Sequence, residues 1–267
     1  MPPVSTAERD PLAAWRVESL RLTAFPSPSA QIIEPTWWHD LRGEEPENRV
    51  SQPRKGGLKE QGPFAGGSLI LGVEPTRIDW VYTPIIDEKQ ASEGFLTIGP
   101  LQDTIGVFTP LMNRWFELET CPTVQRLAFG AVTLQLAQDR RSGYRQLAQY
   151  LHSVQIDIEN SSDFVYQINR KRHSGIIQGL DINRLTRWYV IAQQYVSMQM
   201  VVPPESMQMP SVPTHGSVGP SYHACRLEMD INTVPEFQGG FEREQLTLIF
   251  QELVDLALEI SDHGDIP

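Results

Sequence analysis

The chain has 267 residues, of which 40% are hydrophobic and 21% charged, and its formal net charge is −11. This composition excludes a disordered chain and suffices for a packed core. The negative charge argues against bulk attraction to nucleic acid or to an anionic membrane.

The N-terminal half reads as alternating short elements and loops. Proline at the start and glycine at the end favour a short helix, and apolar alternation around Trp80 favours a hairpin. In chain order we predict a strand over 14–25, a helix over 35–42, a long flexible loop over 43–67, hairpin strands over 68–73 and 77–82, and a helix that begins at Thr109 and Pro110.

The C-terminal half shows a similar order. The stretch ACRLEMDIN alternates apolar and charged residues, which indicates one buried and one solvated strand face. The last helix carries an apolar stripe at helical spacing. The predicted elements are a strand over 123–136, a helix capped by Ser142, strands over 164–168, 185–200 and 224–232, a long flexible loop over 201–221, and a helix over 241–262.

These elements predict one α+β domain over residues 1–267, with a largely antiparallel sheet and helices packed on one face. Residues 14–118 and 123–262 share the order strand, helix, strands, helix. We therefore raise the hypothesis that two similar halves join in one sheet. No repeat at the level of individual residues supports it.

The stretch RKGGLKEQGPFAGG, Arg54–Gly67, is the first candidate for chemistry because glycine-rich loops can cradle phosphate. A phosphate-binding loop needs Gly-Lys-Ser/Thr and a helix directly after it. Neither feature is present here, and the segment leads into a strand. We interpret it as a connector.

Metal and catalytic patterns are also lacking. His215, His223 and Cys225 do not have the spacing of a zinc site, and we predict no metal and no cofactor. Cys121 lies in no nucleophile signature, and Glu228 and Asp230 read as a solvated strand face. We assign no catalytic residue.

The compartment follows from cysteine usage and from the absence of targeting patterns. Two isolated cysteines argue against a disulfide framework and favour a reducing compartment. The start, MPPVSTAERD, lacks the basic and apolar regions of a signal peptide, and no stretch reaches about 18 consecutive apolar residues. We expect a cytoplasmic protein without a membrane segment.

The most informative feature is a basic region over residues 140–187, which holds eight basic and four acidic residues. Arginines next to aromatic residues are typical of protein interfaces and also of nucleic-acid sites. Methionines in the 201–221 loop add adaptable contacts. The predicted partner-binding residues are Arg140, Arg141, Arg145, Arg170, Lys171, Arg172, Arg184, Arg187, Trp188, Met207 and Met209.

From these observations we expect a non-catalytic interaction subunit of a larger assembly that binds protein partners. Self-association is a further expectation, because basic and acidic regions of one chain can complement each other. A nucleic-acid-binding module that uses the 140–187 region is the alternative. A second alternative is an enzyme with a dispersed polar site.

Overall fold

The structure is a computed structural model that describes residues 14–30, 32, 35–52, 56–86, 94–200, 213–237 and 239–266, with the backbone alone for 196–200 and 213–218. No helix of the described part is long and apolar enough to cross a membrane.

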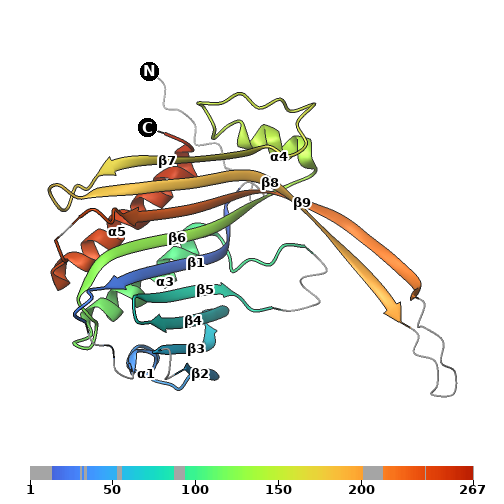
Figure 1. The fold of residues 1–267 in the computed structure, drawn as a ribbon. Helices are drawn as coiled ribbons and strands as arrows, with labels where there is room; N and C mark the ends of the chain where they lie inside the picture. The colour runs from blue at the N-terminus through green and yellow to red at the C-terminus, as the bar shows by residue number, and fades with distance from the viewer. Residues whose placement is uncertain are drawn as a thin grey trace, which may run out of the picture.

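The fold is α+β with an antiparallel sheet, as predicted, and the described residues form nine strands of this one sheet (Figure 1). The strands lie in the order β2-β3-β4-β5-β1-β6-β9-β8-β7. Their bounds are β1 (Arg16–Pro26), β2 (Asn48–Gln52), β3 (Gly57–Phe64), β4 (Gly67–Glu74), β5 (Arg77–Pro84), β6 (Val124–Ala137), β7 (Val165–His173), β8 (Asp181–Met200) and β9 (Pro213–Thr233).

The helices share one face of this sheet. Trp38 of α1 lies against Trp80 of β5, and Cys225 of β9 donates to the carbonyl of Gly143 in α4. The long helices α3 and α5 pack on β1 and β6 (Figure 1). The bounds are α1 (Trp37–Arg42), α3 (Leu101–Glu117), α4 (Arg140–Leu147) and α5 (Arg243–His263).

The two halves follow the same strand pattern. Outward from β1 lie β5, β4 and β3, and outward from β6 lie β9, β8 and β7. Each half also has a helix after its first strand and another after its last. The first half adds β2 at its outer edge. The halves meet where β1 pairs with β6, from Arg16↔Leu134 to Pro26↔Val124.

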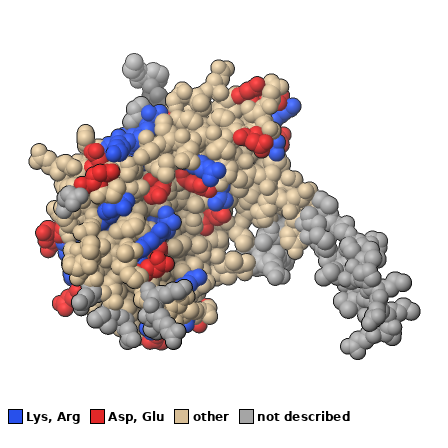
Figure 2. All heavy atoms as spheres, in the orientation of Figure 1, with Lys and Arg blue, Asp and Glu red and all other residues tan. Residues whose placement is uncertain are grey.

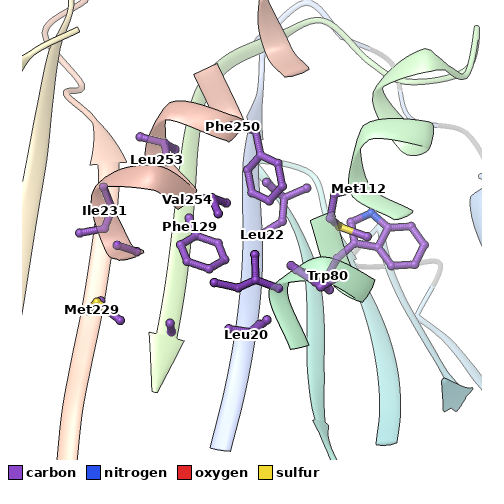
Figure 3. Close-up of a cluster of buried hydrophobic side chains, with 14 of the residues drawn as sticks. Leu20, Leu22, Trp80, Met112, Phe129, Met229, Ile231, Phe250, Leu253 and Val254 are labelled. Atoms are coloured by element: carbon purple, nitrogen blue, oxygen red, sulfur yellow. The ribbon is translucent and has the colours of Figure 1, made fainter. Parts of the chain in front are cut away.

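The core lies between the sheet and the helices at this junction (Figure 3). Phe250 of α5 packs edge-on against Phe129 of β6, with ring centroids 5.9 Å apart, and also against Phe116 of α3. Leu20 and Leu22 point into the same cluster and are fully buried. The alternation along β1 and β9 thus places every second residue in this core.

The prediction of a loop over 43–67 is wrong, because the segment contains β2 and β3. At Gly62 the lack of a side chain serves packing. A Cβ there would lie 2.9 Å from the Trp38 ring, so only glycine lets this indole come so close to β3. RKGGLKEQGPFAGG is therefore mostly strand and not a connector.

Two helix starts and the second loop also differ from prediction. Helix α3 begins at Leu101, and Pro110 lies inside it. The N-cap of α4 is Asp139, which accepts from the Ser142 amide in a capping box, so Ser142 is the third helical residue. The predicted 201–221 loop is partly strand, because β9 begins at Pro213; residues 201–212 lie outside the described residues.

Candidate interaction surfaces

The predicted basic residues do not form one patch, because β7 and β8 point them to opposite faces of the sheet. Arg170 and Arg172 point to the helix side, where they pair with Asp265 and with Glu259 of α5, each at 2.6 Å. Arg184 is buried and donates to the carbonyls of Arg170 and Ile266. These three arginines hold the C-terminal segment against the sheet.

The other predicted residues are scattered. Arg141 and Arg145 on α4 pair with Glu159, and Arg140 is exposed on the same helix. Arg187 and Lys171 lie on the face opposite the helices, whereas Trp188 is fully buried and offers no surface. Met207 and Met209 lie outside the described residues. In Figure 2 basic and acidic side chains are interspersed, with no broad area of one sign.

The carboxylate of Asp265 is the centre of the densest polar network. It accepts two hydrogen bonds from Arg170, at 2.6 and 3.0 Å, and one each from Tyr166 and Ser153, at 2.7 Å. The hydrogen bonds from Arg170 hold the pKa of Asp265 well below its usual range. This buried network is structural, because it holds the C-terminal segment against β7.

The first candidate surface is the face of the sheet opposite the helices, which we call the open face. Across its middle, Arg21 of β1 pairs with Gly130 of β6, which pairs with Asp230 of β9 and then Leu185 of β8. A hollow of about 420 Å³ opens above these residues. Its other lining residues include Ser19, Val81, Val132, Gln167, Arg187 and Glu228.

Glu228, one of the carboxylate pair noted in the sequence, is occupied by its neighbours in this hollow. It accepts from the Tyr189 hydroxyl at 2.6 Å and from Arg226 at 3.0 Å, and it lies 3.8 Å from Arg187. Burial, and then the hydrogen bond to Glu228, raise the pKa of Tyr189 to about 12. The arrangement fixes Glu228 as an acceptor and leaves it no free role as a general base.

The second candidate surface is a two-stranded arm, residues 193–200 and 213–222, formed by the ends of β8 and β9. The last pair between β6 and β9 is Ala137↔His223; beyond it, within the described part of the chain, β8 and β9 pair only with each other, as far as Met200↔Pro213. The arm projects clear of the body (Figure 1). Tyr195 near its base is 44% exposed.

The sequence of the arm is poor in charge. Residues 193–200 and 213–222 include no Asp, Glu, Lys or Arg, although 21% of the whole chain is charged. An isolated hairpin is also marginally stable in water. Both properties suit a segment that packs against another protein.

The cysteines and histidines do not come together. Burial raises the pKa of both thiols, Cys121 and Cys225, to about 12, which keeps them protonated and unreactive. Among the residues with described side chains, no three His, Cys, Asp or Glu groups gather as a metal site requires.

No protein-family model, curated protein or solved structure matches the chain.

Sequence reasoning missed Arg21 and Gly130, because they become neighbours only through the β1–β6 register. It also missed the arm, although the drop in charge over 193–222 could have indicated it.

Proposed function

We propose that this chain is a non-catalytic interaction subunit that binds a protein partner through its β8–β9 arm. The observation that carries the proposal is the arm itself: a ribbon that extends beyond the sheet and whose described residues include no Asp, Glu, Lys or Arg. A ribbon that stayed in water would gain from charged side chains, which keep exposed strand edges from pairing with other chains. Their absence here favours a partner.

The nucleic-acid alternative has less support. Phosphate binding needs unpaired cations on one surface. In the 140–187 region, Arg141, Arg145, Arg170, Arg172 and Arg187 each lie within 4.0 Å of a carboxylate. Binding DNA or RNA would therefore require several ion pairs to break.

The proposal is tested by photo-crosslinking in the native host. A benzoylphenylalanine placed at Tyr195 should give a defined adduct with a protein, because this side chain lies exposed at the base of the arm. The matched control carries the same probe at Leu248, which is 53% exposed on α5. Equal adducts at both positions, or none at Tyr195, would refute the arm as the interaction surface.

A shortened variant gives an independent measurement. Gln194 and Ser221 are register partners, so an Asn-Gly turn can replace residues 195–220 and close the hairpin there. We expect this variant to keep the thermal unfolding of the body and to lose the partner on affinity purification. Retention of the partner would contradict the proposal.

A further inference from the structure

On the open face, opposite charges of β1 and β9 flank β6, which lies between them, at two levels (Figure 1). Glu18 of β1 and Arg226 of β9 span β6 and pair at 2.7 Å. At the level of Gly130, Arg21 of β1 and Asp230 of β9 flank the strand in the same way. Here, however, the Nε of Arg21 is shielded from solvent and has no hydrogen-bond partner among the described residues.

This second level has the features of a binding site. Gly130 forms the floor of the hollow, where a Cβ would lie 3.3 Å from Nε and Nη2 of Arg21, so the guanidinium lies over bare backbone. A shielded donor without an acceptor is unfavourable. Asp230 accepts a hydrogen bond from Asn232 at 3.2 Å, and a carboxylate can accept several more. An occupant that accepts from Arg21 and donates to Asp230 would therefore be stabilised.

The charges of the lining select an uncharged occupant. The charged residues around the hollow are Arg21, Arg187, Glu228 and Asp230, whose formal charges cancel. An anion would face two carboxylates, and a cation would face two guanidinium groups. A neutral group that both accepts and donates hydrogen bonds avoids both repulsions.

The positions of Arg21 and Asp230 restrict the direction of these hydrogen bonds. The two residues lie on opposite sides of Gly130, each one strand spacing of about 4.8 Å away. The occupant must therefore present its acceptor to one side and its donor to the other. A trans peptide group does so, because its C=O and N–H point in opposite directions. The cis amide of a small ring presents both groups to the same side.

We infer that the hollow binds an extended, uncharged segment of the protein partner, with one of its backbone amides between Arg21 and Asp230. The inference rests on the proposed function and names the chemistry of the partner. Val81, Val132 and Leu185 also line the hollow. Apolar side chains of the bound segment would bury surface against them.

A second hollow of about 430 Å³ connects this site with the arm. Ser19 lines both hollows, and Gln193 at the base of the arm lines the second. Ile86, Phe95 and Leu96 give the second hollow an apolar wall. A partner held by the arm can therefore lay an apolar segment on the same face of the sheet.

A titration of the isotope-labelled full chain, followed by NMR at the Gly130 amide, tests the inference. The probe is the capped peptide acetyl-Ala-Val-Ala-Val-Ala-amide, which should shift this resonance in a saturable way. The same peptide with all its backbone nitrogens methylated keeps its carbonyls and loses its donors. It should bind at least about tenfold more weakly.

Two variants remove one side of the site each and keep the Gly130 reporter. Arg21→Met and Asp230→Ala should each weaken binding of the peptide at least about tenfold. The matched control is Lys171→Met, because Lys171 is exposed on the open face at β7, does not line the hollow, and loses the same charge as Arg21→Met. It should bind the peptide as the unmodified chain does. The spectrum of each variant also shows whether its fold is kept.

The inference is overturned if the peptide gives no shift at Gly130, or if the methylated peptide or both site variants bind equally well. A saturable shift with δ-valerolactam, a cyclic cis amide, and none with the peptide would overturn it as well. A protein adduct at Tyr195 without peptide binding in the hollow would leave the proposed function supported. The two failures are therefore distinguishable.

Discussion

At the residue scale, the Asp265 network shows how an acidic chain uses its arginines. Arg170 forms a two-pronged contact with Asp265, and Arg172 does the same with Glu259. Arginine suits this role because its planar fork matches a carboxylate. Three residues of the basic cluster that suggested a binding patch in the sequence, Arg170, Arg172 and Arg184, thus hold α5 and the C-terminal segment.

We predict that Asp265→Asn lowers the free energy of unfolding at neutral pH by about 2–4 kcal/mol, because it leaves the Arg170 guanidinium without its charge partner. Urea denaturation measures the change. Asp163→Asn is the control, because this side chain is exposed. Equal losses for the two variants would contradict the role assigned to the network.

The pH dependence follows from the lowered pKa of Asp265. An unfolded aspartate titrates near about 3.9, so the unfolded state binds the proton first as the pH falls. The contribution of Asp265 to stability is therefore complete above that pH and is lost as the pH falls toward its folded-state pKa. The stability difference between the unmodified chain and Asp265→Asn should accordingly shrink below about pH 4.

At the element scale, β3 shows that glycine can mark close packing as well as a turn. Gly62→Ala should destabilise the chain by about 1–3 kcal/mol, because the new methyl group would lie 2.9 Å from the Trp38 ring. Gly72→Ala on β4 is the control, since its Cβ would come no closer than 4.0 Å to Asp79. Thermal unfolding of both variants measures the difference. If Gly62→Ala proves as stable as Gly72→Ala, β3 does not pack as described.

Elements with clean periodicity were predictable from the sequence. The alternation of Cys225, Leu227, Met229 and Ile231 identified β9, and all four residues are buried. The apolar stripe of α5 was equally clear. Elements whose residues are determined by tertiary contacts were not predictable. Gly62, for example, indicates a flexible loop in the sequence, and only the structure shows that Trp38 lies against it.

The candidate site was less predictable than the fold. Strand parity decides whether Arg170 or Lys171 faces the helices, and the sequence alone left that open. The hollow depends on the register that puts Arg21 beside Gly130, a pairing between residues more than a hundred positions apart. The drop in charge along the arm can be read from the sequence, but the sequence analysis did not use it.

At the scale of the whole molecule, the two halves are interlocked through more than the β1–β6 ladder. Trp15, which precedes β1, packs against Tyr150 and Trp188 of the second half, with ring centroids 5.4 and 6.0 Å apart. Its indole also donates to the carbonyl of Ser261 in α5. Residues of the first half therefore complete the core of the second, and neither half retains its full core alone.

This interlocking predicts a single cooperative unfolding transition for both halves. Tryptophan fluorescence reports mainly on the first half, which holds Trp37, Trp38, Trp80 and Trp115. In a Cys121→Ser variant, pulsed thiol labelling reports on Cys225 in the second half, because that buried thiol becomes reactive only on unfolding. The two probes should give the same urea midpoint and slope, as two-state behaviour requires. Labelling of Cys225 at lower urea than the fluorescence change would instead mean that the second half opens by itself.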